Sequence, residues 1–362
     1  MRHLAFAKTL LLGSALCASA VVAGTSARAD EGVAKGDTSG KKIAFSNSYA
    51  GNSFRQVMIK SFEKIAAEAQ KDGEIAGSTV VSSNNSVTEQ AAQIQNLVLQ
   101  GYDAITVLAG SDTALNGAIK DACEAGVVVV AFASGVTEPC AYVVDYNLDS
   151  YAKAELDFIA GKLGDKPANI LEIRGMAGDG FDKRLHEGVE KAMADHPNYK
   201  SVGEVYGQWT ATVAQKEVSG ILPSLPDVDA VLTQGGDGYG AAQAFKAAGR
   251  DLPIIVMGNR QDELELWKQQ HEASGYETFS LGATPSVSQV AFWVAQQILA
   301  GKDVPKFVEV PLLQIHQDDL DAWLETVPEG GVVNADYSQE LVAKIIDANA
   351  GKTPLPAIPA PN

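Results

Sequence analysis

The chain has 362 residues, of which 46% are hydrophobic, and a formal net charge of −17 at pH 7. One hydrophobic core rarely holds that many residues, so the length predicts two domains. The excess of carboxylates repels nucleic acid and anionic lipid, and it argues against a DNA-binding protein.

Residues 1–29 have the pattern of a cleaved secretory signal. Two basic residues precede an apolar stretch over 10–23, and the small-residue sequence Ala27-Arg28-Ala29 provides a cleavage site. The apolar stretch is shorter than the roughly 20 residues that span a bilayer. A lipoprotein is the alternative because Cys17 lies in this segment, but Leu16 stands where a lipid-attachment site has a small residue. We therefore predict a soluble protein that works outside the cytoplasm.

After a polar leader, apolar strands alternate with amphipathic helices in the first half of the chain. Ser86 followed by Glu89 forms a capping box that opens one of the helices. The uninterrupted apolar run over 127–132 is typical of a strand buried on both faces of a parallel sheet. Strands are predicted over 42–48, 79–82, 103–109 and 127–132, and helices over 52–70, from Ser86 and over 113–125.

The same alternation restarts after Asp145. Strands are predicted over 170–174, 202–206, 230–233 and 254–257, and helices over 150–163, 182–194, 212–222 and 239–248. Helices over 268–274 and 285–300, a strand over 278–281 and an apolar segment over 307–313 can complete both sheets. We therefore predict an α/β fold of two doubly wound parallel-sheet lobes, joined by a hinge that the chain crosses several times.

Each predicted lobe combines two stretches of the chain. The N-terminal lobe takes residues 41–145 plus 283–312, and the C-terminal lobe takes 146–282 plus 313–350. A short helix is predicted from Ser338, and the proline-rich end of the chain predicts a disordered tail over 351–362.

Two cysteines, Cys123 and Cys140, follow the predicted signal. Their even number in a compartment that permits disulfides predicts a bridge between them. Cys123 ends a predicted helix and Cys140 follows the next strand, so the two are close enough in sequence to close a short loop. The alternative is a pair of buried thiols.

Polar loops follow the predicted strands, where ligands bind in open parallel sheets. They carry amides, arginines, aspartates and single aromatic residues, which is the mixture that sugar recognition needs. Sugar hydroxyls pair with fixed donors and acceptors, and the apolar C–H face of the ring stacks on an aromatic ring. Each residue also has a structural alternative: Asn52 can cap a helix, Arg55 can be a solvated first-turn residue, and Trp209 can belong to the core. The glycine-rich loop 235–240 lacks the Lys-Ser/Thr of a phosphate-binding loop.

No catalytic constellation is recognisable in the sequence. The histidines after residue 29 lack the spacing of metal ligands, and no Gly-x-Ser-x-Gly elbow is present; these histidines are His186, His196, His271 and His316. We therefore predict a protein without enzymatic activity, metal or cofactor.

Several stretches together resemble the periplasmic sugar-binding proteins of ABC importers, the type I group that contains ribose-, galactose- and galactofuranose-binding proteins. The resemblance extends from about residue 41 to 313. It rests on the stretch from Lys42-Ile43-Ala44-Phe45 to Asn52-Ser53-Phe54-Arg55, on Gln100-Gly101-Tyr102-Asp103-Ala104-Ile105, on Asp145-Tyr146-Asn147 and on Pro226-Asp227-Val228-Asp229-Ala230-Val231.

The resemblance implies a set of ligand-binding positions. Arg55 is similar to an arginine that holds sugar hydroxyls in the galactofuranose-binding type, and Trp209 to an aromatic residue that stacks on the ring. Asp145 is similar to a residue at the first hinge crossing. The full set is Ser48, Asn52, Phe54, Arg55, Ser134, Asp145, Arg184, Trp209, Gln234, Asp237, Asn259 and Arg260.

The chain departs from the family pattern where relatives place acidic residues. Ala133-Ser134 and Asn259-Arg260 stand at such positions, and Ala283 replaces a glutamine of the ribose type. Losing acidic acceptors while keeping three arginines makes the site less suited to a standard aldopyranose. The resemblance implies a monomeric receptor that passes a monosaccharide or polyol to an ABC permease. A receptor for a sugar acid or other small anion, or a chemoreceptor-coupled sugar sensor, is the alternative.

Overall fold

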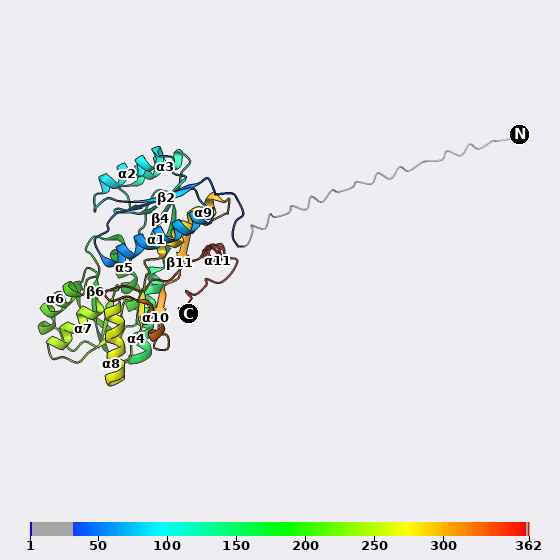
Figure 1. Ribbon diagram of the computed structural model, residues 1–362. Helices are drawn as coiled ribbons and strands as arrows, with labels where there is room; N and C mark the ends of the chain where they lie inside the picture. The colour runs from blue at the N-terminus through cyan, green and yellow to red at the C-terminus, as the bar shows by residue number, and fades with distance from the viewer. Residues whose placement is uncertain (2–31, 360, 362) are drawn as a thin grey trace.

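The computed structural model describes residues 32–359 together with Met1 and Pro361. Residues 2–31, which include the predicted signal after Met1, and the tail residues 360 and 362 lie outside these described residues. The described chain forms two α/β lobes, stacked one on the other in Figure 1. In the part of the chain that is described, no helix combines the length and the apolar character needed to cross a membrane.

The first lobe is built on a six-stranded parallel sheet in the order β11-β5-β4-β3-β1-β2. Successive residues of β1 face opposite sides of this sheet, because Phe45 packs at 5.4 Å on Phe62 while Ala44 belongs to a separate cluster with Ile94 and Ile119. Its strands are β1 (Lys42–Asn47), β2 (Gly77–Ser82), β3 (Ala104–Leu108), β4 (Val128–Phe132), β5 (Tyr142–Tyr146) and β11 (Phe307–Val310). Its helices are α1 (Ser53–Lys71), α2 (Val87–Leu99), α3 (Asn116–Glu124) and α9 (Val287–Leu299). Helices α1 and α9 pack together, as do α2 and α3.

The second lobe has a four-stranded parallel sheet in the order β7-β6-β8-β9. A short antiparallel pair, β10 with β12, adjoins it through a bridge between Met257 and Ser280. The strands are β6 (Ala168–Arg174), β7 (Tyr199–Tyr206), β8 (Ala230–Thr233), β9 (Ile254–Ile255), β10 (Ser280–Gly282) and β12 (Leu313–Ile315). The helices are α4 (Leu148–Leu163), α5 (Gly180–Ala194), α6 (Ala211–Ile221), the 3-10 turn η1 (Leu222–Ser224), α7 (Gly238–Ala247) and α8 (Gln261–Ser274).

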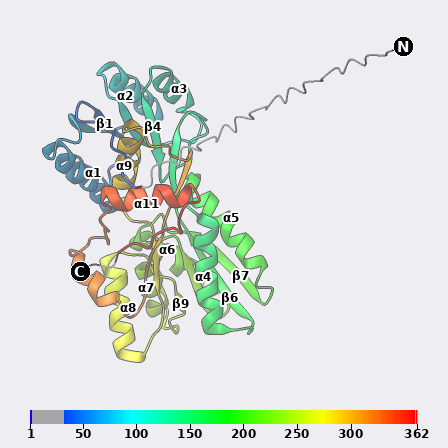
Figure 2. The same cartoon turned by 90° about the vertical axis from the view of Figure 1, so that its right-hand side faces the viewer.

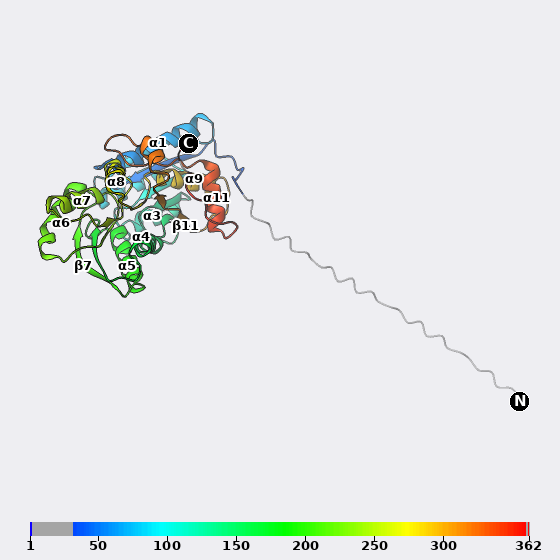
Figure 3. The same cartoon turned by 90° about the horizontal axis from the view of Figure 1, so that it is seen from below.

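The chain crosses between the lobes after β5, after β10, after β11 and again between the last two helices. Two further helices follow, α10 (Leu320–Thr326) and α11 (Gln339–Asn349). Helix α10 packs on α8, whereas α11 packs on α9 and β11 of the first lobe. Figure 2 shows α11 lying across the junction, and Figure 3 shows it beside α9 from below. The expected assignment of all of 313–350 to the second lobe is therefore wrong for α11.

The observed elements confirm the predicted alternation and correct it in several places, one of which is the apolar segment 307–313, where β11 ends at Val310 and a separate strand, β12, begins at Leu313. Strand β5 and helix α10 were not predicted, α8 begins at Gln261 rather than at 268, and α3 begins at Asn116 rather than at 113. The described tail residues 351–359 form no helix or strand, but Ile358 packs against the main core. The expectation of a wholly disordered tail is therefore wrong at this residue.

The predicted disulfide joins Cys123 of α3 to Cys140, which lies just before β5. Closing a loop with a sequence separation of 17 residues restricts the unfolded chain and contributes about 3 kcal/mol of stability. We expect the Cys123→Ser/Cys140→Ser variant to lose about that much free energy of unfolding in urea. A reductant will lower the melting temperature of the parent but not of the variant. Equal stability of parent and variant would contradict the prediction.

A buried carboxyl group on α4 makes stability depend on pH. Glu155 is 1% exposed and accepts one hydrogen bond, from the Thr233 N–H at 3.2 Å. Burial raises the pKa of Glu155 well above its ordinary value. The folded protein then keeps a proton that the unfolded chain has released, so stability falls as pH rises above the ordinary glutamate pKa.

We therefore expect Glu155→Gln to gain stability relative to the parent as pH rises. The gain is about 1.4 kcal/mol per pH unit at pH values between the pKa of Glu155 in the unfolded chain and its higher pKa in the folded protein. Urea unfolding of both proteins at several values between pH 5 and pH 8 measures it. Asp157→Asn is the matched control, because Asp157 lies on the same helix and pairs with Lys153 at the surface. A difference between Glu155→Gln and the parent that does not change with pH would refute the prediction.

Candidate functional site

An ion pair links the two lobes near the first hinge crossing. Asp145, in β5 of the first sheet, is fully buried, and its Oδ2 lies 2.8 Å from Nη1 of Arg184 on α5. Burial raises the pKa of Asp145, and the charge of Arg184 opposes that rise. The Arg184 Nε donates to the Gly180 carbonyl at 3.2 Å. Nη2 of Arg184 is buried and has no hydrogen-bond partner among residues 32–359.

Arg55, in the first turn of α1, interacts electrostatically with Asp179, the N-cap residue of α5 in the second lobe. Asn52 caps α1, because its Oδ1 accepts the Arg55 N–H at 2.9 Å, so the capping alternative holds for this oxygen. Burial lowers the pKa of Arg55 to about 10, while the negative charge of Asp179 in the second lobe opposes that change. The Nη1 atom of Arg55 is buried without a hydrogen-bond partner in the described chain. A guanidinium in this position offers unused donors at the interface between the lobes.

Arg260 makes a third connection between the lobes. Its Nη1 donates to Ser53 Oγ of α1 at 3.3 Å, and its Nη2 donates to the Trp209 carbonyl at 3.4 Å. Asp237 lies near this guanidinium and is fully buried; its Oδ1 accepts the Thr210 N–H at 3.0 Å. Burial raises the pKa of Asp237 well above its ordinary value, and the charge of Arg260 opposes the rise. The Oδ2 atom of Asp237 is buried and unpartnered within the described part of the chain.

The glycine-rich loop 235–238 is shaped by a buried glutamate. Glu263 of α8 accepts backbone N–H groups from Gly238 at 2.9 Å, Gly258 at 3.0 Å and Gly236 at 3.2 Å. A Cβ atom added at Gly238 or Gly258 would lie 2.8 or 2.6 Å from a Glu263 carboxylate oxygen. Glycine is therefore required where the backbone approaches this carboxylate. The Glu263 carboxylate therefore fixes the loop that carries Asp237.

Trp209 lies at the edge of the second sheet. Its indole ring packs on Gly175, where an added Cβ would come within 2.3 Å of the ring, and it meets Phe181 edge-on at 6.4 Å. Trp209 and its neighbour Gln208 both have positive φ, of 52° and 57°. The Trp209 side chain is half-buried.

Gln234 is engaged within its own lobe. Its Oε1 accepts the Gly175 N–H at 3.0 Å and its Nε2 donates to Asp182 Oδ1 at 2.9 Å. Asp182 in turn pairs with Arg174 at 2.7 Å, inside the lobe. These contacts give Gln234 a framework role, and its contact with a ligand stays a prediction.

The other predicted site residues also hold the loops that surround the interface. Ser134 Oγ accepts the Ala109 N–H at 2.8 Å, and Asn259 Nδ2 donates to the Ala283 carbonyl at 2.9 Å. Ser48 is buried at the end of β1, and Phe54 packs partly buried against the main core. Ligand contact by these four residues stays a prediction.

Sequence reasoning missed three polar residues at the interface: Ser53, Asp112 and Asp179. Asp179 caps α5, with Oδ1 accepting the Phe181 N–H at 2.8 Å. The side chain of Asp112, from the first lobe, lies against the same end of α5, since a Cβ atom added at Gly180 would be 3.1 Å from both carboxylate oxygens of Asp112. The Asp179-Gly180 pair in a loop after a strand is the signal that would have identified this helix start.

The chain is similar to known proteins in both sequence and fold. Residues 43–303 match a family model described as a periplasmic binding protein domain. The chain is 27% identical over 250 residues to the xylitol-binding protein of Mycolicibacterium smegmatis, covering 68% of this chain and 70% of that protein. It is 27% identical over 289 residues to the ribose import binding protein of Bacillus subtilis, covering 77% and 90%. A crystal structure of an ABC transporter solute binding protein from Thermobispora bispora has a TM-score of 0.79, with 36% identity over 89% of this chain and 99% of that one.

Proposed function

Since this chain belongs to the periplasmic binding protein family, we propose that it is a periplasmic receptor that binds a sugar or polyol reversibly between its two lobes. The receptor releases its ligand to an ABC import permease and catalyses no reaction. It acts as a monomer, and its signal peptide is removed on export.

The observation that supports this proposal is a set of buried polar atoms without partners at the lobe interface. Two are donors, Nη1 of Arg55 and Nη2 of Arg184, and one is an acceptor, Oδ2 of Asp237; none has a hydrogen-bond partner among the described residues. A buried polar group left unpaired costs about 1–3 kcal/mol. Neighbouring hydroxyls of one small molecule donate and accept at once, so a polyhydroxy ligand offers partners for both kinds of atom.

Trp209 supplies the apolar part of the proposed site. Its half-buried indole ring lies on the same lobe as Asp237 and Arg260. Arg260 donates to the Trp209 carbonyl, and Asp237 accepts the N–H of the next residue, Thr210. In the proposal the ring covers the C–H face of the bound sugar or the carbon chain of a polyol, and burial of that face contributes to affinity.

The connections between the lobes link binding to closure. Arg184 with Asp145, Arg260 with Ser53 and Arg55 facing Asp179 all require the lobes to be close together. A ligand that contacts both lobes has extra contacts only in the closed form, so it shifts the population toward that form. The permease then recognises the closed, loaded receptor.

A neutral ligand is favoured over a sugar acid. Each arginine at the interface already faces an acidic residue or a protein acceptor, and the similar proteins reported above are named for xylitol and ribose. Asp145 and Asp179 therefore already oppose the charges of Arg184 and Arg55 before a ligand enters.

Isothermal titration calorimetry tests the proposal with xylitol, D-ribose, other pentoses, hexoses and pentitols, and with the corresponding sugar acids. We expect one neutral compound to bind with micromolar or higher affinity at one site per chain. Chromatography of the recovered ligand will show it unchanged. Steady conversion of the ligand, or binding confined to the sugar acids, would overturn the proposal.

A further inference from the structure

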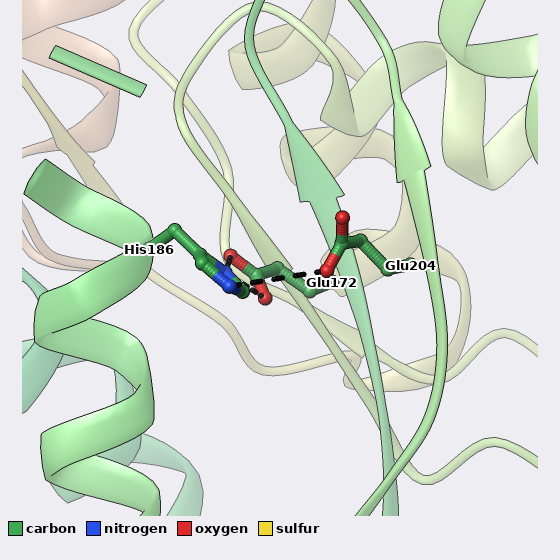
Figure 4. Close-up of side chains that lie close together, drawn as sticks. All are labelled: Glu172, His186 and Glu204. Atoms are coloured by element: carbon green, nitrogen blue, oxygen red, sulfur yellow. Dashed lines mark hydrogen bonds and ion pairs between the residues drawn. The ribbon is translucent and has the colours of Figure 1, made fainter. Parts of the chain in front are cut away.

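Away from the connections between the lobes, three side chains from three elements meet on the second lobe. Glu172 lies on β6, His186 on α5 and Glu204 on the neighbouring strand β7 (Figure 4). Each offers one possible metal-ligand atom, and these atoms all lie within 4.8 Å of one another. Their chemistry, an imidazole nitrogen with carboxylate oxygens, is that of a zinc site.

The imidazole of His186 is held in a fixed orientation. Its Nδ1 lies 2.9 Å from both carboxylate oxygens of Glu172, whose side chain is 10% exposed. With Nδ1 donating to Glu172, Nε2 carries the lone pair and faces outward. Proteins use this carboxylate–histidine arrangement to orient imidazole ligands and to raise their basicity.

The outward nitrogen faces two further carboxylates at more than hydrogen-bond distance. Nε2 of His186 lies 3.7 Å from Glu190 Oε1, one turn further along α5, and 4.0 Å from Glu204 Oε2. Two ligand atoms that each lie about 2.0–2.2 Å from one Zn²⁺ are slightly closer to each other than Nε2 is to either of these carboxylate oxygens. The Glu190 and Glu204 side chains are 70% and 38% exposed, so solvent leaves them room to rotate toward a shared ion.

Arg174 orients the Glu204 carboxylate. Its single positive charge does not neutralise the glutamates around His186. Its Nη1 lies 3.1 Å from Glu204 Oε1, which directs Oε2 toward His186. The same guanidinium pairs with the buried Asp182 at 2.7 Å, so its positive charge is shared. The three glutamates around the imidazole therefore retain the excess of negative charge that favours a divalent cation.

We propose that His186 Nε2, Glu204 and Glu190 bind one Zn²⁺ on the second lobe, with Glu172 as the positioning residue. This assignment differs from the sequence-based expectation of no metal site. The bound ion connects β7 to α5 and stabilises that edge of the sheet, because it binds the folded lobe and not the unfolded chain.

The test uses purified protein that has been stripped with a chelator, and Zn²⁺ alone as the probe. Competition with a fluorescent zinc chelator at pH 7.5 measures affinity and stoichiometry. We expect one Zn²⁺ per chain with micromolar or higher affinity. His186→Gln will weaken binding at least 100-fold, Glu204→Gln at least 10-fold, and Glu172→Gln 10- to 100-fold. His196→Gln is the matched control on the same lobe, since the ring of His196 stacks on Tyr199, and it will bind as the parent does.

A second measurement separates metal binding from folding. Zn²⁺ will raise the melting temperature of the parent and of His196→Gln, and it will not raise that of His186→Gln. If His186→Gln fails to fold, Glu204→Gln decides, because its side chain is partly exposed and its loss leaves the core intact. Parent protein that takes up no stoichiometric Zn²⁺, or a Glu204→Gln variant that binds with parental affinity, would show a metal-free ionic cluster and overturn the proposal.

Discussion

Replacing Arg55 by alanine will weaken ligand binding roughly 100- to 1,000-fold, which corresponds to about 3–4 kcal/mol. The expected loss comes from two hydrogen bonds between the guanidinium and ligand hydroxyls, each worth about 1.5–3 kcal/mol with a charged donor. The melting temperature of the ligand-free protein will stay close to that of the parent, because Nη1 of Arg55 contributes no hydrogen bond within the described chain. Calorimetry with the ligand identified in the screen and a thermal melt measure the two effects.

Two further variants define what Arg55 contributes. Arg55→Lys keeps the charge and removes the planar pair of donors, so it will bind with intermediate affinity. Lys60→Ala removes an exposed positive charge from the same helix and will bind as the parent does. An Arg55→Ala affinity within threefold of the parent would identify Arg55 as a helix residue without a role in binding.

The fold was predictable from sequence where local pattern decides the structure. The buried parallel strands and the amphipathic helices have clear periods, so the α/β alternation and the two lobes followed from them. Strand β5 was missed because its pairing partners are β4 and β11, and β11 lies far along the chain. The first turn of α8 is polar, and it is fixed by Glu263 binding N–H groups of two other loops. Such long-range contacts leave no local period in the sequence.

The candidate site was predictable as a set of loops but not as a set of contacts. Sequence indicated the polar residues after each strand, yet it did not tell which of them bind other protein groups. Gln234 is occupied by Gly175 and Asp182, whereas Arg55 keeps an unpaired donor. The zinc cluster was missed for the same reason, because Glu172 and Glu204 meet only when β6 and β7 pair.

Replacing Arg184 by alanine will weaken ligand binding because it destabilises the closed form of the protein. In that form Asp145 is fully buried, and Arg184 supplies its opposing charge at 2.8 Å. Removing one partner of a buried ion pair costs about 3–5 kcal/mol, but the Arg184 side chain is 37% exposed, so water screens part of the interaction. We therefore expect a loss of about 2 kcal/mol, or roughly 30-fold in affinity. Lys183→Ala removes a neighbouring exposed charge and serves as the control.

The pH dependence of this variant separates the loss of the ion pair from a general loss of contacts. Burial raises the pKa of Asp145 and Arg184 opposes the rise, so the pKa rises further when Arg184 is absent. Closure of Arg184→Ala then takes up a proton, and its affinity will improve relative to the parent as pH falls from 7.5 toward 5. Calorimetry of Arg184→Ala, Lys183→Ala and the parent across this range measures the change. A deficit in affinity that is the same at every pH would mean that Arg184 acts only as a ligand contact, and that Asp145 is not exposed to water when the lobes open.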